Sequence, residues 1–321
     1  MAHTISIEAT AAGLQQFVQR FSTQIHSTLR QGLEFEADLP FVETDYAYTG
    51  QEGEVTDLLQ PYQPQFTPKG DESFDGITSY LRPIKIDKLF EAEELEKFFS
   101  RWRANWFTPD PEQTKMTYTQ YLMQQLVGPK LNEELNLVSW KGEYSAPTPG
   151  TAGAVLESAD GFKKNIATHI NSGRITPLNT GIVDTAEMVA YVRDFCKLVP
   201  EPYRYYGGTI YMSKTNAQAY ADDYQEKYPT RMVNEQQQDK LYLRVDHFNK
   251  VIKGCTAMEG DDRMILVFNN LESMIIGTRT GYPRYFNFRF EPEDRNLKVF
   301  AEIYRFYNFE TTKHCFFSDQ A

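Results

Sequence analysis

Apolar residues recur at steps of three and four in several parts of the chain, and this spacing predicts amphipathic helices. Within residues 8–30, one stripe carries Leu14, Phe17, Val18, Phe21, Ile25 and Leu29. Further helices are predicted over residues 91–107, from Asp110 to about Leu135, from Asp184 to Phe195, and from Ser213 to Tyr228. The Gly128-Pro129 pair interrupts the helix that begins near Asp110, so we expect a kink or a restart there.

Other segments have the period of two that strands show. Phe286, Phe288 and Phe290 alternate with polar residues, a turn follows over residues 292–296, and Leu297 begins a return strand. This pattern predicts a β-hairpin. Short apolar strands are predicted at 209–212 and 264–268, and with the neighbouring helices they predict a small α/β module.

Residues 32–90 are rich in Gly, Pro and acidic residues and show no strong helical period. Strands are predicted at 34–39 and 77–86, with a turn signal at Pro68-Lys69-Gly70-Asp71. A connection this long has little core of its own, so it is either a functional arm or a mobile loop. Residues 142–182 are rich in Gly, Ala, Thr and Pro, which predicts a linker at a subdomain boundary.

Composition narrows the function classes. The 321 residues are 41% hydrophobic and 24% charged, a globular balance, and the 14% aromatic content favours β-rich structure. The net charge of −11, without long basic runs, argues against sequence-specific DNA binding but leaves passive contact with packaged nucleic acid open. Three widely spaced cysteines suit free thiols in a reducing compartment. No stretch is apolar enough for a membrane span, and the first residues do not resemble a signal peptide.

Candidate chemistry is sparse. No phosphate-binding loop is found, and the five histidines and three cysteines lack metal-site spacing, so neither a cofactor nor a metal is expected. Cys196 lies in an apolar helix and is interpreted as buried packing rather than a nucleophile. The aromatic rows fit a core better than a carbohydrate platform. We therefore expect a non-enzymatic, self-assembling subunit, since projecting arms bury their apolar face only in an assembly.

The order of these parts resembles the Hong Kong 97-type major capsid proteins of tailed bacteriophages. The resemblance spans nearly the whole chain, and the order of several degenerate motifs carries it. These motifs are Trp140-Lys141-Gly142-Glu143, Asp160-Gly161-Phe162, the strand and cap Gly208-Thr209-Ile210-Tyr211-Met212-Ser213, Ile252-Lys253-Gly254-Cys255, the strand 264–270, and the closing strands with Asp294-Arg295-Asn296, Ala301-Glu302 and Arg305.

This resemblance implies an α+β fold with an N-terminal arm, an extended β-hairpin loop, a spine helix, a peripheral domain and an α/β axial domain. Carried onto this sequence, the arm is 1–30, the extended loop 31–90, the peripheral domain with the spine helix 91–159, and the axial domain 160–255. Residues 256–321 then supply axial edge strands and return to the peripheral hairpin. Cys255 departs from the family, which often has Pro near this position.

The resemblance also implies a function. The chain is expected to be a structural subunit of an icosahedral viral shell, forming hexamers and pentamers that enclose double-stranded DNA. It would assemble in a bacterial host's cytoplasm, with portal and scaffold proteins as partners and no membrane. Contacts between subunits are expected from Leu14, Phe17, Phe21, Ile25 and Lys69. Some family members cross-link a loop lysine to a neighbour's asparagine, but no partner for Lys69 stands out, so no cross-link is predicted.

Two other interpretations stay open at this point. An encapsulin-like nanocompartment shares the implied fold but encloses protein cargo. A β-rich carbohydrate-active hydrolase or lectin would use the aromatic and acidic residues instead.

Overall fold

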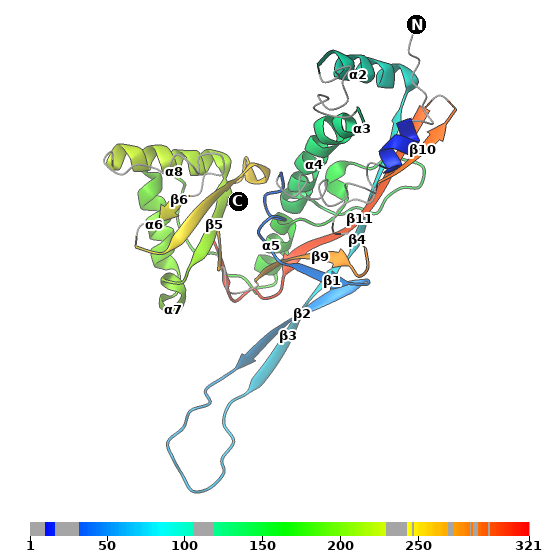
Figure 1. The fold of residues 1–321 in the computed structure, drawn as a ribbon. Coiled ribbons are helices and arrows are strands. Elements are labelled where there is room, and N and C mark those ends of the chain that lie inside the picture. The colour runs from blue at the N-terminus through cyan, green and yellow to red at the C-terminus, as the bar shows by residue number, and fades with distance from the viewer. Residues whose placement is uncertain are drawn as a thin grey trace.

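The computed structural model describes most of the chain as two sheets with helices, plus a projecting hairpin (Figure 1). The described residues are 10–16, 32–105, 118–228, 243–245, 247–268, 273–282, 284, 288–294 and 296–320. Within them, no helix has the length and apolar character that a bilayer crossing requires.

The first sheet is organised around its longest strand, β11 (Asn296–Phe309), which pairs antiparallel with three others. These are β4 (Arg82–Phe90), β9 (Met274–Arg279) and β10 (Arg289–Glu293), and β1 (Phe41–Thr44) then pairs parallel with β9. Burial alternates along β11 from Asn296 to Tyr304, as the sequence predicts for a strand with one covered face, whereas the last five residues, 305–309, are all buried. The predicted β10–β11 hairpin is confirmed.

The second sheet has the strand order β12, β8, β5, β7, β6. Its strands are β12 (Cys315–Phe317), β8 (Ile265–Phe268), β5 (Gly208–Ser213), β7 (Lys250–Cys255) and β6 (Leu243–Val245). β5 and β7 run parallel, as expected where helices connect neighbouring strands, so the predicted α/β module is confirmed. Its core is one apolar cluster that joins the strands to two helices.

The two helices of this module begin where the sequence predicts. α6 (Met188–Leu198) follows a short turn capped by Asp184, whose carboxylate accepts a hydrogen bond from the amide of Ala186. α8 (Lys214–Lys227) is capped by Ser213, whose hydroxyl accepts from the amide of Asn216 at 3.2 Å. Both caps satisfy amide groups that the first helical turn leaves without partners.

A long helical segment runs beside the first sheet. It comprises α3 (Tyr118–Tyr121), the π-helical η2 (Leu122–Val127) and α4 (Gly128–Lys141), with Pro129 in the first turn of α4. The restart predicted at Gly128-Pro129 corresponds to the change from η2 to α4, and the backbone stays helical there, with Gly128 at φ −59° and ψ −50°, because proline is tolerated in the first turn of a helix. The predicted helix over 91–107 is α2 (Ala92–Asn105), with Leu95 and Trp102 buried.

Three of the predicted elements differ from the structure. Residues 34–39 form a turn, with the amides of Asp38 and Leu39 both donating to the carbonyl of Phe35, because the side chains of this segment bind partners far along the chain. The strand predicted at 77–86 is two strands, β3 (Glu72–Tyr80) and β4, which separate at Leu81 to join different sheets. The linker predicted at 142–182 contains a helix, α5 (Phe162–Asn171), whose apolar face is buried.

Further short helices are η3 (Val155–Glu157), η4 (Thr185–Glu187), α7 (Glu201–Arg204) and η6 (Thr256–Met258).

The core between the sheets explains why residues 34–39 turn inward. Phe35 is fully buried and stacks on Trp140 of α4 with ring centroids 5.9 Å apart. Glu36 and Arg305 form an ion pair that is 1% and 0% exposed, with the Nε–Oε1 distance at 2.9 Å. The Tyr307 hydroxyl donates to the same carboxylate at 2.8 Å. This turn therefore ties the N-terminal part of the chain to β11, more than 250 residues later.

Candidate functional site: the projecting hairpin

The most distinctive surface feature is the hairpin of β2 (Ala47–Val55) and β3, which extends away from the body (Figure 1). Its register runs from Ala47 opposite Tyr80 to Val55 opposite Glu72. Among the described strands, these two pair only with each other. Every residue from 53 to 76 is exposed. An isolated two-stranded ribbon is marginal in water, so this one has to gain stability elsewhere.

The hairpin ends in a loop, residues 56–71, that is closed by its own polar groups. The amide of Thr56 donates to the carbonyl of Asp71 at 3.1 Å, and the Gln60 side chain donates to the carbonyl of Thr67 at 2.7 Å. Lys69 is exposed, and its ammonium donates to the carbonyl of Leu59 at 2.7 Å. The loop thus has a defined shape without a core beneath it.

The side chains on this loop are apolar to a degree unusual for a surface. Residues 58–68 include no charged residue. Leu59, Tyr62 and Phe66 are 91%, 94% and 89% exposed, and Leu58 is also exposed. Single exposed apolar residues are ordinary, but a cluster of them on a projecting element is typical of a surface that another molecule covers. We call Leu58, Leu59, Tyr62 and Phe66 the apolar tip.

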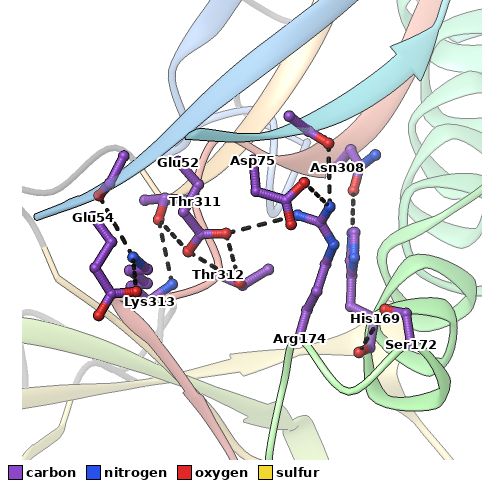
Figure 2. Close-up of polar contacts among 12 residues, drawn as sticks. Glu52, Glu54, Asp75, His169, Ser172, Arg174, Asn308, Thr311, Thr312 and Lys313 are labelled. Carbon is purple, nitrogen blue, oxygen red and sulfur yellow. Dashed lines mark hydrogen bonds and ion pairs between the residues drawn. The ribbon is translucent and has the colours of Figure 1, made fainter. Parts of the chain in front are cut away.

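Side chains from the body hold the base of the hairpin (Figure 2). Glu52 of β2 is only 8% exposed and accepts hydrogen bonds from the hydroxyls of Thr311 and Thr312, at 3.0 and 3.2 Å. On β3, Asp75 is 2.7 Å from Nη2 of Arg174, which lies three residues beyond α5. These contacts join both strands of the hairpin to the body.

Two further contacts lie beside this base. The Lys313 ammonium is 3.0 Å from the carboxylate of Glu54, an exposed ion pair. Gly50 lies so close to the backbone that a Cβ atom there would be 2.7 Å from the carbonyl oxygen of Glu310. A larger residue at position 50 would therefore push the hairpin away from the body.

A buried histidine completes the base. Nε2 of His169 in α5 is 3.1 Å from Oδ1 of Asn308, whose amide nitrogen donates to the hydroxyl of Ser79 on β3 at 2.8 Å. Burial lowers the pKa of His169 below its ordinary value of 6.5. The hydrogen bond to Asn308 opposes this shift, whereas the positive charge of Arg174 adds to it. The imidazole ring is therefore neutral at neutral pH. In this state its hydrogen bond with Oδ1 of Asn308 orients the Asn308 amide nitrogen toward Ser79 on β3.

The residues that the sequence predicts as subunit contacts fall in different places. Lys69 lies on the exposed loop. Leu14 is 1% exposed and packs within its own chain, against residues of α4, β10 and β11. Phe17, Phe21 and Ile25 lie outside the described residues. Sequence reasoning missed Glu52 and the base contacts, because their partners lie at least 98 residues away and leave no local pattern.

The described residues offer little chemistry for catalysis. They contain no group of three or more His, Cys, Asp or Glu side chains placed to hold a metal ion. Cys196, Cys255 and Cys315 are all buried, and burial raises the pKa of the Cys196 and Cys315 thiols to about 12. Nucleophilic attack needs an accessible thiolate, which these positions do not provide.

The fold is shared with proteins that form shells. It matches a chain of the satellite phage P4 procapsid, a structure that includes the size determination protein, at a TM-score of 0.58 and 11% identity, covering 92% of this chain and 90% of that one. The capsid of an empty GTA particle matches at 0.53 and 10% identity, covering 89% of each chain. An encapsulin complex from Synechococcus elongatus matches at 0.50 and 10% identity, covering 88% of this chain and 84% of that one. No family model and no curated protein matches the sequence.

These matches confirm the resemblance to capsid proteins at the level of the overall fold. The chain has the mixed helix-and-sheet fold of phage capsid proteins of the Hong Kong 97 type. Encapsulin shells share this fold. At 10–11% identity the matches establish the fold alone.

Proposed function

We propose that this chain is the structural subunit of an icosahedral viral shell, assembling as hexamers and pentamers around double-stranded DNA. One observation carries the proposal: a chain with a capsid fold has a projecting hairpin whose apolar tip is covered by nothing in its own described residues. The tip gains burial when it lies on a second copy of the chain. The proposed role is structural, and the proposed location is the virion.

The geometry of the hairpin suits a ring of identical subunits. The tip lies far from the base in one copy, so the surface that receives it on the next copy is a different surface. Such heterologous contacts close into rings when the rotation between copies permits. Obligate contacts of this kind bury more than about 2,000 Å². A projecting arm adds interface area without enlarging the body of the subunit.

In the proposed shell, residues 1–30 serve as a second arm, and Leu14 anchors that arm on its own subunit. Leu14 and Ala11 support this part, since both are buried against the first sheet. Phe17, Phe21 and Ile25 then contact a neighbouring subunit, as does Lys69 at the other arm. Residues 91–159 form the peripheral domain and 160–255 the axial domain, with 256–321 completing both.

The negative net charge of the chain is consistent with a shell that encloses DNA without binding it tightly. With a net charge of −11, the subunit has little general attraction for the phosphate backbone, so the enclosed DNA would not adhere strongly to the shell. Portal and scaffold proteins are the proposed partners during assembly. No membrane takes part in the proposed pathway.

An encapsulin-like shell around protein cargo is the second candidate, because an encapsulin shares the fold at almost the same coverage. The two candidates differ in what the particle contains.

The test is to express the chain alone and measure the mass of the purified product, followed by electron microscopy. Icosahedral particles of megadalton mass support a shell protein. Particles recovered from the native source then separate the candidates, since nuclease-protected DNA supports the viral shell and co-purifying protein cargo supports the encapsulin. A stable monomer that binds sugars would overturn both candidates.

A further inference from the structure

The base of the hairpin contains an arrangement that pairing of β2 with β3 does not explain. Glu52 and Asp75 are direct cross-strand partners in the register of β2 and β3. Two carboxylates placed opposite each other destabilise a strand pair. The hairpin nevertheless keeps its register on both sides of this pair, from Gln51 with Gly76 to Gly53 with Phe74.

The compensating charge comes from the body, and Figure 2 shows Arg174 joined by dashed lines to both acids. Nη2 of Arg174 is 2.7 Å from Asp75 and donates to the carbonyl of Gly76 at 3.3 Å. Nη1 of the same guanidinium is 3.8 Å from Glu52. One rigid, planar cation thus contacts both strands, which a flexible lysine would not do with the same geometry.

This pair is also the last firmly held point of the hairpin. Glu52 is buried, whereas every residue from 53 to 76 is exposed. Beyond it, the body reaches the hairpin through Lys313, whose partner Glu54 is 60% exposed, and exposed ion pairs contribute little. Because the hairpin is attached to the body at this pair and projects far beyond it, a small change of backbone direction at the pair produces a much larger displacement of the apolar tip.

We propose that Arg174 is a positioning residue that sets the direction of the hairpin by neutralising the Glu52–Asp75 pair. The inference deepens the proposed shell function, on which it rests, by naming the group that aims the arm at its neighbour. Removing the guanidinium leaves two carboxylates in opposition at the pivot. The strands then separate or twist there, and the tip samples many directions.

The experiment measures the direction of the arm by pulsed electron paramagnetic resonance. Spin labels go on Gln65→Cys in the loop and Glu291→Cys on β10, which are both exposed positions, while the three native thiols are buried. Distances are recorded on the dissociated chain, so the result does not depend on whether shells form. The test variant is Arg174→Gln. The matched control is Lys313→Gln, which removes the other body cation that pairs with an acid of β2.

The wild-type chain and Lys313→Gln are expected to show the same narrow distance distribution. Arg174→Gln is expected to broaden this distribution and shift its mean, with circular dichroism unchanged. Adding Asp75→Asn to Arg174→Gln removes the like-charge pair and should restore much of the narrow distribution. A role limited to general stability would not produce this rescue.

Two results would overturn the inference. One is an Arg174→Gln distribution that matches the wild type in mean and width. The other is equal broadening in Lys313→Gln, which would show that any body cation has the same effect. Neither result bears on the proposed shell function, which the mass of the assembled particle tests separately.

Discussion

Replacing three of the four side chains of the apolar tip should raise the concentration needed for assembly at least about thirtyfold while leaving the subunit folded. The change is the triple variant Leu59→Ser, Tyr62→Ser and Phe66→Ser. These side chains are 91%, 94% and 89% exposed, so the isolated chain loses almost no packing with them. Surface changes of this kind alter the free energy of unfolding by no more than about 0.5 kcal/mol.

The effect on association should be much larger. Fully burying a large apolar side chain contributes about 1.5–3 kcal/mol, so the three together supply about 5–9 kcal/mol to each contact of the tip. Ordering side chains and fixing the arm cost part of this gain. Even if about 2 kcal/mol survives per contact, its loss raises the concentration needed for assembly about thirtyfold.

The assay is sedimentation velocity across a concentration series, with electron microscopy of any fast-sedimenting material. The control is the conservative triple variant Leu59→Ile, Tyr62→Phe and Phe66→Leu, which keeps the loop apolar and should assemble near the wild-type threshold. Assembly of the serine variant at the wild-type threshold would refute the reasoning, provided that thermal melting shows both chains folded.

Three further predictions concern the body and the base of the hairpin. Glu36→Gln leaves Arg305 buried without its counter-charge and should lower the free energy of unfolding by about 3–5 kcal/mol, measured by urea denaturation, whereas adding Arg305→Met should recover part of the loss. The pKa of His169 in the folded chain is below 6.5, so as the pH falls below 6.5 the unfolded chain binds more protons than the folded chain. The free energy of unfolding should therefore decline in this pH range, and His169→Gln should make the decline smaller. Gly50→Ala places a methyl group against the backbone and should cost about 1–3 kcal/mol, while Gly53→Ala, which faces an exposed ring, should be nearly neutral in the same assay.

Each of these has a contrary outcome. Equal stability of Glu36→Gln and the wild type would mean that the buried pair contributes nothing. The exposed His247→Gln serves as the control for the titration, and a decline below pH 6.5 that His169→Gln leaves unchanged would assign it to other groups. Equal effects of alanine at positions 50 and 53 would show that the close approach to the body is unimportant.

The local sequence pattern was sufficient to predict those helices and strands whose own residue spacing shows which face is buried. The apolar spacing predicted α2, α6 and α8, and Ser213 marked the start of α8 because its hydroxyl caps the amides of the next turn. Alternating aromatic residues predicted the β10–β11 hairpin. The period of a sequence reports which face of an element is buried, and that property needs no knowledge of the partner.

The sequence therefore determined most elements and, through their order, the resemblance to a capsid fold. Only the tertiary structure decided what the acidic residues of segment 31–90 do. Glu36 and Glu52 are buried against Arg305, Arg174 and the threonines near the C-terminus, at separations of more than 100 residues. A charged side chain in a polar stretch has the same appearance whether it faces water or a distant cation, because the cost of burying a charge is repaid by a partner that the local sequence does not contain.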